Sequence, residues 1–182
     1  MTNTFHWNAL YTRGKEERKV CRQLEKRGIV HYCPEHLDQV MDQGVEKTIS
    51  KPIFTSLVFV RAGFTDGAAL LKLPGVINFK YWQDAPVQIA DAEIEALRDF
   101  MERHPEVKAA KTSLLPVDQE AGTVTPKFNV AENTYSIQLP TIGYCLTAPA
   151  EPVTVKLIRK NPPRYRAAEG LAHLLGFKSA GG

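Results

Sequence analysis

The nine residues Pro52-Ile-Phe-Thr-Ser-Leu-Val-Phe-Val60 decide the fold of this 182-residue chain. Leu57 to Val60 is an unbroken apolar run, which is typical of a central β-strand. Because successive strand residues point to opposite faces, Leu57 and Phe59 share one face while Val58 and Val60 share the other. Both faces of the sheet are therefore apolar. Either the sheet is covered twice by its own chain, or one face binds a partner.

The segments around this strand alternate between strand and helix patterns. We predict strands over 5–11, 29–33 and 76–82, and a polar hairpin with its tip at Gln43-Gly44. Helices are predicted over 16–27, over 66–71 with Asp66 as its cap, and after Asp91, which is expected to cap the last helix. The last helix carries an apolar stripe made of Ile94, Leu97, Phe100 and Met101. This order, with a mainly antiparallel sheet, predicts an α+β fold.

Prolines are denser in the second half of the chain, which indicates a compact first domain followed by a looser second part. We predict a compact domain over residues 5–103 and a linker over 104–118. A small β-domain over 119–160 follows, with strands over 122–124, 133–139 and 153–158. Residues 161–182 form a basic tail. A β-unit of about 40 residues is too small to be very stable alone.

Composition excludes several classes of protein. Hydrophobic residues at 43% and charged residues at 24% indicate a folded chain, not a disordered one. The net charge of +3 excludes a histone-like protein, although residues 13–27 alone carry +4. No apolar run approaches the ~20 residues of a membrane span, and the N-terminus does not resemble a secretory signal. Three cysteines without a CxxC motif predict reduced thiols, and we expect a cytoplasmic protein without membrane attachment.

The sequence offers no catalytic motif. GxSxG, GxxxxGK[ST], GxGxxG and HExxH are all absent, so we predict neither an enzyme nor a cofactor. His31, Cys33 and His36, with Cys21 upstream, match no standard zinc spacing. We interpret Cys33 as sheet filling and His36 as a loop residue, and predict no metal.

Two features predict binding without specifying the partner. The segment from Arg13 to Arg27 carries seven Lys or Arg and three Glu side chains. Such a helix face is either simply solvated or follows a phosphate backbone. The apolar side chains of residues 52–60, with Phe79, Tyr81 and Trp82 nearby, are either core or a surface for a partner protein.

An ordered set of residues runs through this first domain. It comprises Trp7-x-x-Leu-Tyr11, Glu17-x-x-Val20, Leu24, Gly28-Ile, Pro34, Pro52-Ile-Phe-x-x-Leu-Val-Phe-Val60, Pro74-Gly-Val76 and Pro86-x-x-Ile. In order and spacing the set resembles the N-terminal domain of the NusG family over residues 5–103. Within that family the chain looks like a specialised paralogue of the RfaH or UpxY kind.

The resemblance implies a transcription elongation and antitermination factor that binds the clamp helices of RNA polymerase. It would suppress pausing or termination at specific long operons. The positions that match the family's polymerase-binding patch are Phe54, Leu57, Phe59, Phe79 and Trp82. Those that match the face toward the non-template DNA strand are Arg13, Lys19 and Lys26. Leu57→Asp or Phe59→Asp is then expected to abolish polymerase binding in a folded protein.

The chain departs from the family pattern at two places. Ile53, Thr55, Ser56 and Leu57 replace the common Pro-Leu-Phe-Pro-Gly/Asn-Tyr strand. Thr125-Pro-Lys-Phe128 is a remnant of the Gly-rich loop of the family's KOW barrel, whereas residues 135–143 resemble its end. The resemblance thus implies a degenerate KOW-like β-barrel unit, which in the family contacts ribosomal or termination proteins. An alternative function is a ribosome- or RNA-associated protein that uses this unit and the basic tail.

Overall fold

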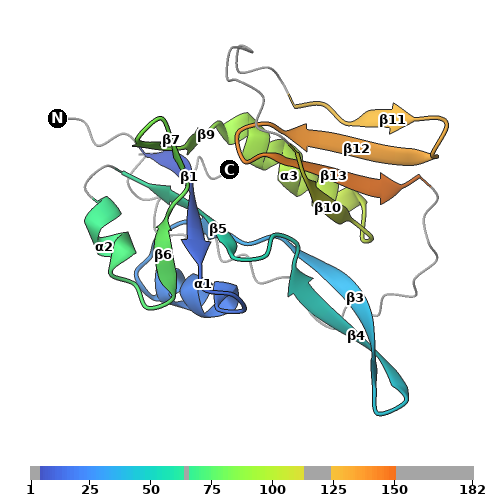
Figure 1. The fold of residues 1–182 in the computed structure, drawn as a ribbon, viewed down its shortest axis with the longest axis horizontal. Helices are drawn as coiled ribbons and strands as arrows, with labels where there is room; N and C mark the ends of the chain where they lie inside the picture. The colour runs from blue at the N-terminus through green and yellow to red at the C-terminus, as the bar shows by residue number, and fades with distance from the viewer. Residues whose placement is uncertain (1–4, 64–65, 113–123, 151–182) are drawn as a thin grey trace, which may run out of the picture.

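The computed structural model describes residues 5–63, 66–112 and 124–150. The first part of the chain forms a five-stranded antiparallel sheet in the order β2-β5-β1-β6, with β9 also pairing with β1. Its strands are β1 (His6–Thr12), β2 (His31–Tyr32), β5 (Leu57–Ala62), β6 (Val76–Phe79) and β9 (Gln88–Ile89). Its helices are α1 (Glu17–Lys26), α2 (Gly67–Leu71) and α3 (Asp91–Arg103). The predicted α+β fold is confirmed (Figure 1).

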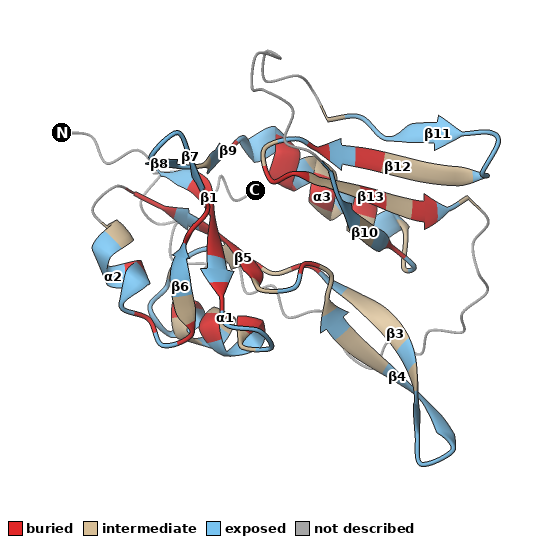
Figure 2. Ribbon diagram, viewed as in Figure 1, coloured by how far each residue is buried: buried red, intermediate tan, exposed pale blue. Residues whose placement is uncertain are grey.

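Two hairpins extend this domain. The longer one pairs β3 (Glu35–Asp42) with β4 (Val45–Pro52) around the predicted turn at Gln43-Gly44, and it projects from the body of the molecule (Figure 1). The shorter one pairs β7 (Tyr81–Trp82) with β8 (Ala85–Pro86). Buried residues line β1 and β5, whereas the outer half of the long hairpin is exposed (Figure 2).

A second antiparallel sheet has the order β10-β13-β12-β11. Its strands are β10 (Lys108–Lys111), β11 (Lys127–Asn129), β12 (Thr134–Leu139) and β13 (Tyr144–Pro149). The strand predicted over 133–139 corresponds to β12. β10 lies within the segment that was expected to be a linker. A strand forms there because pairing with β13 stabilises a Lys-Ala-Ala-Lys stretch of low β-propensity. Residues 122–123 and the strand predicted over 153–158 lie outside the described residues.

The first sheet is covered on both faces. On one face Leu10, Val58 and Val60 pack against α1 and α2 through side chains that include Val20, Leu24 and Leu70; we call this cluster the N-terminal core. On the other face Trp7, Leu57 and Phe59 belong to a cluster that we call the interdomain core. It includes Ile94, Leu97 and Phe100 of α3, and Ile137, Leu139, Ile142 and Leu146 from the second sheet and its turn.

Local chemistry fixes the ends of several elements. The turn at Pro74-Gly75 is as predicted, and Gly75 has a φ of +95°. An L side chain is strained at this φ, and a Cβ atom there would also lie 3.1 Å from Cγ2 of Val20, so this turn favours glycine. Asp66 precedes α2 as expected, and its carboxylate accepts a hydrogen bond from the Gly63 amide at 3.0 Å. Asp91 is the first helical residue of α3 and not its cap, which is Ala90.

Candidate functional site

A buried glutamate positions the loop before β5. Ser56 has a φ of +60°, and its amide donates a hydrogen bond of 2.7 Å to Oε1 of Glu17. The Ser56 carbonyl accepts from the Thr12 amide at 3.0 Å. Glu17 is only 4% exposed, so this bond supplies a partner for a carboxylate that burial would otherwise destabilise. The loop therefore presents Phe54 and Leu57 in a fixed direction.

Three of the predicted polymerase-binding residues lie together. Phe54, Leu57 and Phe59 are all in the interdomain core, each at most 2% exposed. The rings of Phe54 and Phe59 meet edge to face, with centroids 5.7 Å apart. We call these three side chains the covered face.

The second sheet covers this face. The Tyr144 ring of β13 meets the Phe54 ring edge to face, with centroids 4.8 Å apart. The buried side chains of Leu139, Ile142 and Leu146 belong to the same cluster. Of the two interpretations that the sequence left open, the described structure shows the first: the chain itself covers both faces of its sheet.

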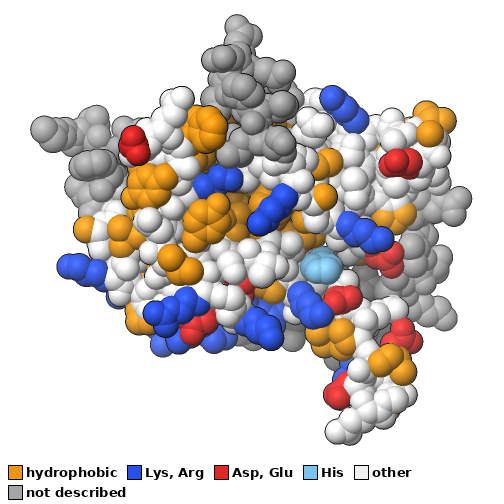
Figure 3. Space-filling view, viewed as in Figure 1, with side chains coloured by type: hydrophobic (Ala, Val, Ile, Leu, Met, Phe, Trp, Pro, Cys, Tyr) orange, Lys and Arg blue, Asp and Glu red, His pale blue; other side chains and the backbone are white. Residues whose placement is uncertain are grey.

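The other two predicted patch residues lie elsewhere. Phe79 stands opposite Leu10 in the β1–β6 register and packs in the N-terminal core, on the other side of the sheet from Leu57. Trp82 lies on the β7–β8 hairpin and is 42% exposed. Tyr11, Ile77 and Tyr81 are also exposed, and apolar side chains are visible in Figure 3 over β1, β6 and β7. The structure thus assembles three members of the predicted patch and separates two.

A pair of buried charges meets the turn between β12 and β13. Lys80 is 8% exposed, and its Nζ donates a hydrogen bond of 2.5 Å to the Ile142 carbonyl. Glu93 of α3 is 4% exposed and faces the Thr141 hydroxyl and the amides of Thr141 and Ile142. Its Oε1 has no hydrogen-bond partner within the described part of the chain. The hydrogen bond from Lys80 thus holds the turn, and beside it lies the Glu93 carboxylate with one oxygen unpartnered.

Burial shifts the pKa of both groups toward their neutral forms. Desolvation raises the pKa of Glu93, against the opposing effects of the Thr141 and Ile142 donors and of Lys80. Desolvation lowers the pKa of Lys80, against Glu93 and together with Lys111. Sequence reasoning did not find this pair, because it depends on contacts between distant parts of the chain.

The raised pKa of Glu93 predicts a pH dependence. The folded chain holds this proton at pH values where the unfolded chain, with an ordinary pKa of 4.5, has released it. The stability contribution of Glu93 therefore falls as pH rises from about 4 through the raised pKa. We expect the Glu93→Gln variant to gain stability relative to the parent chain between about pH 4 and pH 7. Urea unfolding of both chains across this range measures the gain, and a constant difference would contradict it.

The predicted DNA-facing residues all lie at the surface. Arg13, Lys19 and Lys26 are exposed, and Lys19 and Lys26 are seven residues apart on one face of α1. Lys19 pairs with Glu16 at 3.2 Å, an exposed contact of small energetic value. Arg18 is engaged by Glu35 of β3 through two bonds, at 2.6 and 3.0 Å. Lys and Arg side chains gather over α1 at the lower edge of Figure 3.

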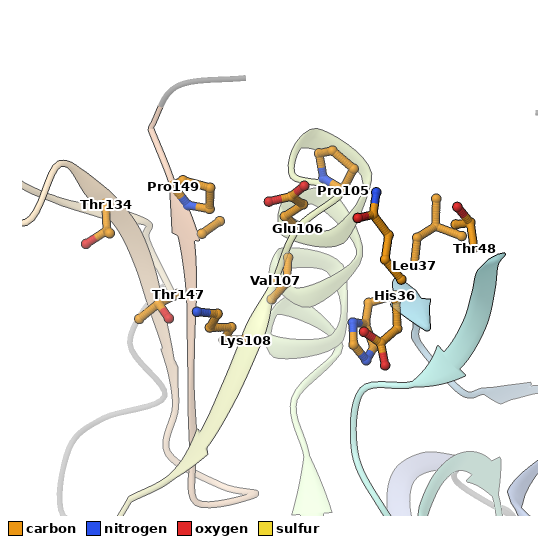
Figure 4. Close-up of a pocket in the computed structure, with 13 residues that line it drawn as sticks. His36, Leu37, Thr48, Pro105, Glu106, Val107, Lys108, Thr134, Thr147 and Pro149 are labelled. Carbon is orange, nitrogen blue, oxygen red and sulfur yellow. The ribbon is translucent and has the colours of Figure 1, made fainter. Parts of the chain in front are cut away.

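A cleft of about 640 Å³ lies between the long hairpin and the second sheet (Figure 4). Its lining includes His36 and Thr48 of the hairpin, Glu106 and Lys108 after α3, and Thr147 of β13. His36, expected in a loop, is a half-buried residue of β3. Within the described ranges no three His, Cys, Asp or Glu side chains are grouped to hold a metal ion.

Cys33 and Cys21 pack against the N-terminal core. Contact with Cys21, followed by burial, raises the pKa of the Cys33 thiol far above its ordinary value. Cys33 therefore stays a neutral thiol, in keeping with its interpretation as sheet filling. The helices of the described residues include none that is long and apolar enough to span a membrane.

Comparison with known proteins identifies the family. The family described as transcription termination factor NusG matches residues 5–98. Among solved structures the chain is similar to NusG of Thermotoga maritima, reported for its domain interaction, with 11% identity and a TM-score of 0.42. That match covers 81% of this chain and 94% of the other. No curated protein sequence matches the chain. Since the family match spans more than half of its residues, the chain belongs to the NusG family of transcription factors.

Proposed function

We propose that the chain is a transcription elongation and antitermination factor of the RfaH or UpxY kind. It binds the clamp helices of RNA polymerase and suppresses pausing or termination at specific long operons. Its membership of the NusG family carries this proposal. NusG proteins are non-enzymatic transcription factors, and the chain acts by binding in the cytoplasm.

The covered face is the proposed polymerase-binding surface. Phe54, Leu57 and Phe59 form one apolar cluster at the positions that match the family's patch. In the described arrangement Tyr144 and the β12–β13 turn cover this cluster. The clamp helices can reach it only where the second sheet moves away, because both would occupy the same surface. Trp82 is 42% exposed on the separate β7–β8 hairpin, so it is not part of this covered cluster.

Arg13, Lys19 and Lys26 form the proposed contact with the non-template strand. Their exposure and the gathering of cations over α1 support it. Neutralised phosphates release counterions, so each contact adds to the salt dependence of binding.

We expect the variant that combines Lys19→Glu and Lys26→Glu to bind elongation complexes more weakly. The slope of log affinity against log salt should fall by about 2, one for each lost phosphate contact. Titration of fluorescent chain at several salt concentrations measures the slope. The matched control combines Lys72→Glu with Lys127→Glu, two exposed lysines outside α1. If both variants have the same slope, the helix face does not contact DNA.

Two assays test the proposed function. Purified chain is passed over immobilised RNA polymerase and over ribosomes, and transcription through a terminator is measured with and without the chain. We expect retention on polymerase and increased read-through. Retention on ribosomes alone, with unchanged read-through, would instead favour a ribosome- or RNA-associated protein.

A further inference from the structure

The β12–β13 turn rests on two side chains that act in opposite directions. Lys80 comes from the junction of β6 and β7, and Glu93 from the first turn of α3. The backbone of Lys80 is itself fixed, because its amide donates to Ala9 and its carbonyl accepts from Val87, both at 2.8 Å. Only the side chain of Lys80 therefore remains to be ordered when its ammonium group meets the Ile142 carbonyl.

The Lys80 bond closes the interface. A hydrogen bond with a charged donor is stronger than a neutral one, and here it satisfies a carbonyl buried between the two sheets. When the second sheet separates, water can replace this bond. The bond therefore favours the closed arrangement.

Glu93 weakens the same interface. Its carboxylate is buried with Oε1 unpartnered, although the Thr141 hydroxyl, the amides of Thr141 and Ile142, and Lys80 lie nearby. Burial of a poorly satisfied charge costs free energy, and this cost is relieved when the turn moves off and water reaches the carboxylate. A neutral side chain of the same shape would not carry that cost.

We propose that Lys80 and Glu93 form a balanced latch on the Thr141–Ile142 turn, in which Lys80 holds the second sheet closed and Glu93 keeps it releasable. The latch concerns the separation of the two sheets within one chain. Its consequence, control of access to the covered face, rests on the function proposed above.

Separation is measured by energy transfer within single molecules of the full chain. An azide-bearing amino acid replaces the exposed Glu25 of α1 and Glu132 before β12, and carries the two dyes. This labelling leaves the three native cysteines unchanged. The separated fraction is compared among the parent chain, Lys80→Met, Glu93→Gln, and both changes together.

Lys80→Met is expected to raise the separated fraction roughly tenfold, since it removes a charged hydrogen bond and leaves the Ile142 carbonyl unsatisfied. Glu93→Gln is expected to lower it, most measurably in the Lys80→Met background, by at least about threefold. The matched controls are Lys72→Met and Glu95→Gln, at exposed positions, which should leave it unchanged.

Two outcomes would overturn the latch: both variants shift the separated fraction in the same direction, or neither differs from its control. Where Lys80→Met fails to fold, the comparison of Glu93→Gln with Glu95→Gln decides. Polymerase binding is measured separately. If the two variants shift energy transfer in opposite directions but the chain does not bind polymerase, the latch is supported and the proposed function is contradicted.

Discussion

Replacing Phe59 with aspartate is expected to unfold the N-terminal domain. The Phe59 side chain is 0% exposed, and its ring meets both Phe54 and Tyr32. Removal of a buried phenyl ring costs about 3–5 kcal/mol, and a buried carboxylate without a partner adds several more. Since domains of this size are stable by about 5–15 kcal/mol, most molecules should be unfolded.

Urea unfolding followed by circular dichroism measures this loss. Phe128→Asp is the matched control, because Phe128 lies on the edge strand β11 and is 48% exposed. If both variants unfold at the same urea concentration, Phe59 does not lie in a packed core. The predicted loss also changes how the surface can be tested. The sequence led us to expect that Phe59→Asp stays folded. Because Phe59 is buried, a loss of polymerase binding by this variant would report unfolding and not a lost contact.

Ile142→Asp is expected to open the interdomain contact while leaving the N-terminal sheet intact. Ile142 lies in the turn after β12, is 2% exposed, and faces Glu93 through its amide. While the second sheet covers the first, an aspartate there adds a second buried carboxylate beside Glu93. Once the sheets separate, this carboxylate is no longer buried beside Glu93. A cost of about 3 kcal/mol corresponds to more than a hundredfold shift toward separated sheets.

The shift should strengthen binding to RNA polymerase, because a larger fraction of molecules presents the covered face. Equilibrium binding of labelled chain to elongation complexes measures it. Val130→Asp is the control, since Val130 follows β11 and is 81% exposed. Unchanged or weaker polymerase binding by Ile142→Asp, in a chain whose sheets have separated, would contradict the assignment of the covered face.

Short-range patterns predicted the first domain well. The alternation in Leu57–Val60, the turn at Gln43-Gly44 and the apolar stripe of α3 all depend on neighbouring residues, and the structure confirms each. Glu17 was available to the same reasoning. It lies three residues before Val20 and seven before Leu24, on the apolar face of α1, so its burial could have been predicted.

Long-range pairing determines what the sequence did not reveal. The placement of Phe79 depends on its register against Leu10, and one strand was expected where β6 and β7 are separate. The strand β10 contains no β-branched residue, and only its pairing with β13 indicates it. Which element covers Leu57 and Phe59 is likewise set by the packing of two sheets, which no local pattern encodes.

The central claim is that RNA polymerase binds the face that the second sheet covers. Energy transfer between dyes at positions 25 and 132 of the full chain tests it most directly, measured while RNA polymerase elongation complexes are titrated. We predict that transfer falls as the complexes saturate the chain, because the second sheet must leave the covered face. Binding of the chain with unchanged transfer would show that polymerase uses another surface and would contradict the claim.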